Sequence, residues 1–291
     1  MIWLVLSILF SSILFVIFKL FERLKVHTLQ AIVINYAVAA CIGFFISDVP
    51  IHFETITQAS WLPYTLILGF LFIAVFNVMA LTTQRNGLSV AAVAGKMSLV
   101  IPVTLGIAFY KESAGWIKMS GIVIALLAVY LTTVRARNIA NTKKTLSTIT
   151  LPVMLFLGSG IIDSLIKFIE VHYLKPELEP IVSATIFSTA FVIGSLVLGY
   201  DYLKSGTKLD LKSVIAGIVL GIPNYFSIIF IFKALASFDE ASFVYPLNHV
   251  GTIIASTFLG LLLFRERLHA RNWLGILLAV AAIALIAFAK A

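Results

Sequence analysis

Long apolar runs separated by short polar segments fill almost the whole 291-residue chain. A helix that crosses the roughly 30 Å hydrocarbon core of a membrane needs about 20 such residues. The pattern therefore predicts an all-α polytopic membrane protein with ten transmembrane helices. Their expected ranges are 2–18, 28–47, 61–83, 88–110, 116–134, 151–172, 180–200, 213–236, 241–264 and 272–289. The remaining loops are too short for a soluble catalytic domain, so any functional site should lie inside the helix bundle.

The most polar stretch divides the chain into two similar halves. It spans residues 135–150 and predicts a linker between a first five-helix repeat, 1–134, and a second, 151–291. Glu112 and Gly121 align with Glu266 and Gly275 at a constant offset of 154 residues. Because each half has an odd number of helices, the second must enter the membrane in the opposite sense. Two inverted-topology repeats of five helices are typical of transporters, with the substrate site near the membrane midplane.

The composition supports a membrane protein and removes other classes. Hydrophobic residues make up 61% of the chain and charged residues 12%, against about 45–50% and 25% in soluble domains. The mean hydropathy is +1.08. A net charge of +8 would suggest nucleic-acid binding in a soluble protein, but here we attribute it to cytoplasmic loops. The single cysteine, Cys41, excludes an internal disulfide and a cysteine metal cluster.

The distribution of basic residues predicts an orientation. Of the 21 Lys and Arg residues, 14 lie in the loops after the odd-numbered helices, five on the opposite side and two inside the membrane. Since basic loops stay in the cytoplasm, both termini are expected outside it. We expect a multi-pass protein of the plasma membrane, which in a bacterium is the inner membrane. The apolar start of the chain has no basic segment before it, so we interpret it as a first transmembrane helix.

Two segments carry a family resemblance. FYKESAGWIKMSGIVIALLAVYL and LFRERLHARNWLGILLAVAAIAL each place an acidic residue before a turn and a Gly-led apolar helix. This arrangement resembles the EamA-type transporters of the drug/metabolite transporter superfamily. LSVAAVAGKMSLVIPV is similar to the fourth helix of that family, and ASFVYPLNHVGTIIASTFLGLLLFRE to its ninth. The resemblance implies a ten-helix carrier with a central cavity between the repeats, commonly an exporter of amino acids, other metabolites or drugs.

Two features depart from the family. Pro246 lies 20 residues before Glu266, whereas Pro102 lies ten before Glu112, so the two prolines are not repeat partners. Family members are usually described with both termini in the cytoplasm, opposite to the orientation that the basic residues predict here.

Two ionisable residues inside the membrane are the first substrate-binding candidates. Lys96 and His249 each lie about eight residues into an expected helix and are related by an offset of 153. Ionisable groups in a bilayer are costly and are by default functional candidates. A cation and an imidazole suit a substrate with a carboxylate or phosphate. Alternatively, Lys96 extends to the membrane surface or pairs with a neighbour, and His249 is a packing residue.

Polar uncharged residues complete the predicted substrate site. Tyr245 and Asn248 flank Pro246 and His249, and Asn77 and Asn224 lie on other expected helices. For any one of them a hydrogen bond between helices is the favoured role, and Tyr245 and Asn248 are the better substrate candidates. We expect Pro102 and Pro223 to interrupt their helices and free backbone groups that could line a cavity, or, as an equal alternative, to kink the helices with an effect on shape alone. The glycines of the motif at 217–221 are expected to let helices approach closely.

Acidic residues supply the candidates for coupling and gating. Asp163 and Lys167 are four residues apart and share a helix face. Asp163 and His249 are candidates for proton coupling, but for Asp163 we favour a structural ion pair with Lys167 that fixes the helix end. Glu112 and Glu266 are expected near the membrane surface as helix-end or gate charges.

These features together predict a secondary transporter that moves a small metabolite by alternating access. An amino acid or similar charged solute is the expected cargo, and export the expected direction. A metabolite importer and a broad-specificity drug exporter are the alternatives. A membrane-embedded enzyme or a scaffold is disfavoured because the sequence has neither an HExxH motif nor a phosphate-binding loop. We expect no cofactor, metal or nucleic-acid partner, and a monomer suffices because one chain holds both repeats, although a dimer is compatible.

Overall fold

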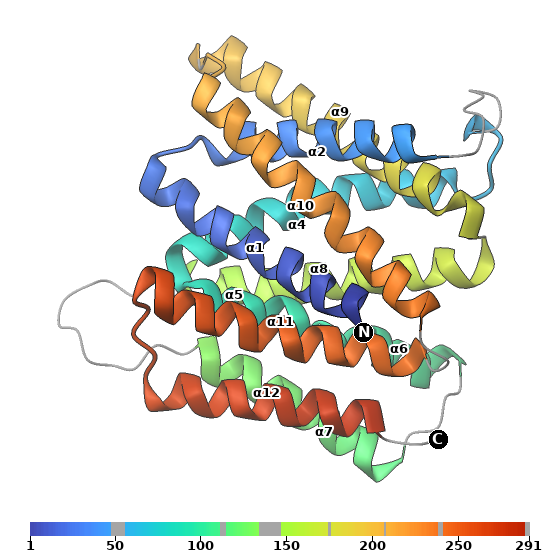
Figure 1. Cartoon of the computed structure of the whole chain (residues 1–291), viewed down its shortest axis with the longest axis vertical. Coiled ribbons are helices and arrows are strands. Elements are labelled where there is room, and N and C mark those ends of the chain that lie inside the picture. The colour runs from blue at the N-terminus through green and yellow to red at the C-terminus, as the bar shows by residue number, and fades with distance from the viewer. Residues whose placement is uncertain are drawn as a thin grey trace. The chain divides into compact units, whose positions relative to one another are not determined.

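The chain is helical throughout the part that the structure, a computed structural model, describes. These residues are 1–47, 56–110, 115–133, 147–173, 176–206, 208–237 and 241–288, and they contain no strand. The helices are α1 (Ile2–Leu24), α2 (Thr28–Ile46), α4 (Leu62–Asn86), α5 (Leu88–Met97), α6 (Val100–Tyr110), α7 (Trp116–Thr133), α8 (Ser147–His172), the 3₁₀ turn η1 (Pro176–Leu178), α9 (Glu179–Ser205), α10 (Leu211–Ala236), α11 (Ala241–Phe264) and α12 (Ala270–Phe288), shown in Figure 1. Within the described ranges, nine helical segments are long and apolar enough to cross a membrane, and Trp116–Thr132 is a shorter apolar helix. The predicted all-α membrane fold is confirmed.

Several helices extend beyond their apolar runs. The first was expected to end at residue 18, but α1 continues through Lys19, Glu22 and Arg23 to Leu24. Similarly, α9 ends at Ser205 because Gly206 adopts a left-handed conformation, φ 66°, and donates its N–H to the Tyr202 carbonyl. Hydropathy marks where a segment leaves the apolar core, whereas a helix ends where its last carbonyls are capped.

The fourth predicted helix is broken into α5 and α6 at Ser98 and Leu99. Pro102 has no N–H to donate to the carbonyl of Ser98, four residues earlier, and its ring crowds that carbonyl. The Ser98 carbonyl instead accepts from the N–H of Ile101 at 2.9 Å. The expected interruption at Pro223 was wrong, since Pro223 lies inside the continuous helix α10. Pro246 likewise lies within α11.

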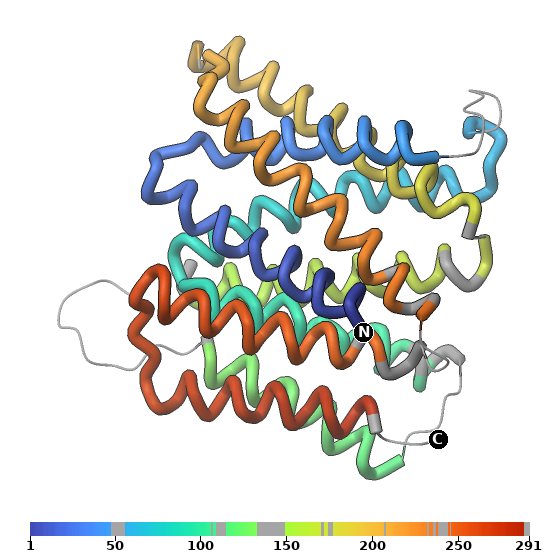
Figure 2. Tube along the Cα trace, viewed as in Figure 1, coloured from blue at the N-terminus to red at the C-terminus, as the bar shows by residue number. Residues whose placement is uncertain are grey.

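The chain forms two compact units, and Figure 2 traces the order of their segments. The first unit comprises 1–19, 78–161 and 226–291, and the second comprises 20–77 and 162–225. Each unit takes residues from both predicted repeats, so the units are not the repeats. The boundaries at 134 and 151 stay a prediction.

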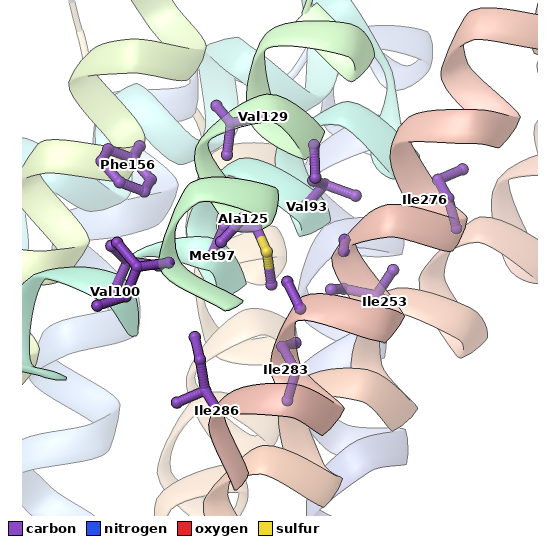
Figure 3. Close-up of a cluster of buried hydrophobic side chains, with 14 residues drawn as sticks. Val93, Met97, Val100, Ala125, Val129, Phe156, Ile253, Ile276, Ile283 and Ile286 are labelled. Carbon is purple, nitrogen blue, oxygen red and sulfur yellow. The ribbon is translucent and has the colours of Figure 1, made fainter. Parts of the chain in front are cut away.

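The core of the first unit is an apolar cluster between α5, α7, α11 and α12. Figure 3 shows its side chains, among them Val93, Met97, Ile253 and Ile283. Helices α7 and α12 lie side by side (Figure 1). Their approach depends on glycine. A Cβ atom on Gly275 would lie 3.0 Å from the Ala128 carbonyl oxygen.

The contact between α7 and α12 repeats itself with the helices exchanged. Gly121 packs against Ala282 and Ile286, and Gly275 packs against Ala128 and Thr132. Each residue on α7 has its counterpart 154 positions later on α12. The later a contact residue lies on one helix, the earlier its partner lies on the other, so the helices are antiparallel. This is the relation that an inverted repeat requires.

In the second unit, α2 packs against α9 and α10. A Cβ atom on Gly217 would lie 2.6 Å from the Ala31 carbonyl oxygen, and one on Gly221 would lie 2.9 Å from that of Asn35. The expected close approach at these glycines is confirmed. The Tyr36 hydroxyl donates to the Phe72 carbonyl at 2.8 Å and joins α2 to α4.

Candidate functional site

Lys96 lies in the last turn of α5, directly before the break at Ser98. Its side chain is half-buried. The C-terminal end of a helix carries a partial negative charge, which favours a cation in this turn. Because Pro102 ends α5 here, the proline determines how deep in the bundle this helix end, and with it Lys96, lies.

His249 of α11 lies against this helix end, and Asn248 directly precedes it in α11. Both side chains are more than nine-tenths buried, with 8% and 5% of their surface exposed. The ring of His249 donates a hydrogen bond to the backbone carbonyl of Lys96 and interacts electrostatically with that residue. The structure thus brings together two residues that the sequence related only through the repeat offset.

Two polar atoms of this group have no hydrogen-bond partner in the described part of the chain. They are Nδ1 of His249 and Oδ1 of Asn248, and both are buried. An amide oxygen only accepts hydrogen bonds, and Nδ1 of an imidazole accepts when the proton is on Nε2. A buried acceptor without a partner costs about 1–3 kcal/mol. The site is therefore suited to a ligand that brings N–H or O–H donors.

Two hydroxyl groups that the sequence analysis did not single out continue along the same face of α11. Thr252 and Ser256 are fully buried. The Thr252 hydroxyl donates to the Asn248 carbonyl at 2.7 Å, and the Ser256 hydroxyl donates to the Thr252 carbonyl. The four-residue spacing from Asn248 is the signal that could have identified them.

Glu266 occupies the opposite end of α5. Its carboxylate accepts the N–H of Leu88 at 2.5 Å and the hydroxyl of Ser89 at 3.0 Å. Glu266 thus lies at a helix end, as predicted, and its carboxylate caps the start of α5. Its repeat counterpart, Glu112, lies outside the described residues.

The remaining candidates are not gathered around Lys96 by any described contact. Tyr245 lies in α11, one turn before His249. Asn77, Asn224 and Asp163 belong to the second unit. Asn77 donates its amide to the Ile73 carbonyl of its own helix at 2.7 Å. Asn224 is buried and Asp163 partly buried, and their roles in binding and proton coupling stay predictions.

The described residues contain no group of three or more His, Cys, Asp or Glu side chains that could hold a metal ion. Beside the α5–α11 contact, α5 offers the cation Lys96 and α11 offers the acceptors of Asn248 and His249. This arrangement can hold a polar solute and release it unchanged.

Comparisons with known proteins agree with the helical pattern. Residues 1–134 match the model of the EamA-like transporter family, which confirms the resemblance seen in the sequence. An uncharacterised protein of Haemophilus influenzae is 29% identical over 288 residues, which cover 96% of this chain and 95% of that protein. A solved protein crystal structure has the same fold, with a TM-score of 0.62, 14% identity and coverage of 98% of this chain and 94% of that one.

Proposed function

Since the first 134 residues match the model of the EamA-like transporter family, we propose that the chain is a membrane transporter that carries a small charged metabolite. An amino acid or a similar zwitterion fits best, moved by alternating access and, by analogy with the family, outward. The second candidate is a broad-specificity drug exporter or a metabolite importer. The polar group of Lys96, Asn248 and His249 is the proposed binding site.

The observation that carries the proposal is the pairing of a cation with unsatisfied acceptors. The Lys96 side chain can donate to a carboxylate or phosphate. No donor among the described residues bonds to Oδ1 of Asn248 or Nδ1 of His249, and an ammonium group would supply several donors. A solute with one anionic group and one donor group satisfies both requirements, whereas a hydrophobic cation would be repelled by Lys96.

The test is thermal stabilisation of the purified protein by a panel of related solutes. The panel contains an amino acid, the amine that lacks its carboxylate and the keto acid that lacks its amine. A ligand at 100 times its Kd adds about 2.7 kcal/mol to the stability of the state that binds it. We expect the intact zwitterion to stabilise the protein most. Lys96→Ala should abolish the effect, and Lys212→Ala, an exposed lysine at the start of α10, should not.

Other outcomes of the solute panel would favour a different function or a different binding site. Stabilisation by hydrophobic cations alone would favour the drug exporter. Normal stabilisation of Lys96→Ala by the zwitterion would refute the binding site while leaving the transporter family in place. Transport in vesicles loaded on one side or the other then decides between export and import.

The orientation is a separate part of the proposal. For a protein of the plasma membrane, the 14 basic residues in the loops after odd-numbered helices favour an orientation with both termini outside the cytoplasm. Protease or tag accessibility of the N-terminus in intact cells tests it. A protected N-terminus would give the orientation usual for the family.

A further inference from the structure

We propose that Glu266 is a latch that closes the route to the Lys96 site from the end of the bundle where α5 begins. The latch is the set of hydrogen bonds from the α5 N-terminus to the Glu266 carboxylate. This inference rests on the proposed transport function and adds a named gating residue to it. Its evidence lies within the first unit.

The carboxylate is held by a site shaped to receive it. The backbone N–H groups of Leu88 and Ser89 donate to its two oxygens at 2.5 and 3.4 Å, and the Ser89 hydroxyl adds a third bond at 3.0 Å. The first N–H groups of a helix have no partner within it, and they carry partial positive charge. A carboxylate from another segment therefore satisfies them better than a neutral group.

Two glycines leave room for the carboxylate on either side. A Cβ atom on Gly87 would lie 2.9 Å from Oε1 of Glu266, and one on Gly260 would lie 2.7 Å from Oε2. Gly87 also has φ 104°, a conformation that other residues rarely adopt. Arg265, with φ 51°, turns the chain at the end of α11, so that the Glu266 N–H bonds to the Gly260 carbonyl at 3.1 Å.

The position of these bonds makes them a gate. Helix α5 has ten residues, about 15 Å at 1.5 Å per residue, with Glu266 at its first turn and Lys96 in its last. The hydroxyls of Thr252 and Ser256 on α11 donate to carbonyls of α11 itself. Release of the Glu266 contacts would let the start of α5 move away from α11. This movement would open a path between the two helices toward Lys96.

The test measures access to the site from each side of the membrane. Asn248→Cys, in a Cys41→Ser background, places a thiol in the buried site. A membrane-impermeant thiol reagent is applied, without substrate, to vesicles that expose one side or the other. We expect Glu266→Gln to raise the labelling rate from the side of Glu266 roughly five- to tenfold, as the loss of a helix cap implies, and to lower it from the opposite side. Glu177→Gln, an exposed carboxylate of η1, is the matched control.

Opposite changes in the labelling rates from the two sides distinguish a gate from a merely structural cap. Loss of such a cap would raise the labelling rate from both sides. Equal labelling of Glu266→Gln and the parent, or a rise from both sides, would overturn the proposal. If Asn248→Cys does not fold, hydrogen exchange at Leu88 and Ser89 with and without Glu266→Gln provides a second measurement, and unchanged exchange would also overturn it. Because labelling needs no substrate, a failed solute panel would reject the proposed cargo without affecting this result.

Discussion

Replacement of Gly275 by alanine tests the antiparallel contact of α7 and α12. The added Cβ atom would lie 2.6 Å from Cγ2 of Thr132 and 3.0 Å from both the Thr132 nitrogen and the Ala128 carbonyl oxygen. Backbone atoms cannot rotate away. Nor is Thr132 free to change rotamer without loss, because its hydroxyl bonds to the Ala128 carbonyl at 2.9 Å. The helices must therefore separate.

The expected cost follows from two opposing effects. Overpacking costs about 1–3 kcal/mol, while alanine gains up to about 1 kcal/mol over glycine in helix propensity. Gly275→Ala should therefore destabilise the protein by up to about 2 kcal/mol, the difference that remains when the full propensity gain is subtracted from the overpacking cost. Gly121→Ala should cost less, because its tightest contact is the flexible Ile286 side chain and its backbone contacts are 3.2 and 3.3 Å. Gly199→Ala in α9 meets nothing within 4 Å and should stabilise the protein slightly.

Thermal unfolding of the three purified variants is the assay, and the order of stability is the readout. We expect thermal stability to decrease from Gly199→Ala through Gly121→Ala to Gly275→Ala. Thr132→Ser removes Cγ2 and should partly rescue Gly275→Ala, which a double-mutant cycle measures. Equal stability of Gly275→Ala and Gly199→Ala would refute the close packing of α7 and α12.

Three further predictions concern single residues. Pro102→Ala supplies the N–H that Pro102 lacks, so that residue 102 can donate to the Ser98 carbonyl; the change should raise thermal stability yet slow transport, and normal transport would mean that the break affects only shape. Asp163→Asn should abolish proton-driven uptake but preserve exchange of labelled for unlabelled solute, whereas unchanged uptake would remove Asp163 from the coupling. Tyr36→Phe removes the bond to the Phe72 carbonyl and should cost about 0.5–1.5 kcal/mol in thermal stability with transport retained, and a transport defect at full stability would assign Tyr36 a role in function.

The fold could be predicted from hydropathy because the membrane imposes one strong rule. Backbone polar groups in lipid must bond internally, so each apolar run of sufficient length becomes a helix. The ends of α1 and α9 were missed because the rule stops at the membrane surface. Pro102 and Pro223 gave the same local signal with different results, since a helix can retain a proline where neighbouring groups compensate. Only the surroundings of each proline decide this.

The site was predictable in part. Lys96 and His249 stood out because ionisable residues are rare in apolar runs, and the repeat offset related them. The hydrogen bond from the His249 ring to the Lys96 backbone was not predictable, because it depends on where the break at Ser98 turns the chain. Glu266 was expected at a helix end, but its partner, the start of α5, lies 177 residues away from it at Ser89. No sequence pattern encodes that distance.

The matching contacts of α7 and α12 have a consequence for the origin of the protein. An interface in which each helix presents the corresponding positions to the other resembles an isologous one, the kind that joins two identical subunits in a symmetric dimer. A shorter ancestral chain carrying one copy of this helix could thus have formed the contact with a second copy inserted upside down. Duplication and fusion of its gene would then have fixed the two orientations, after which each copy could diverge, as the exchange of lysine for histidine between positions 96 and 249 illustrates.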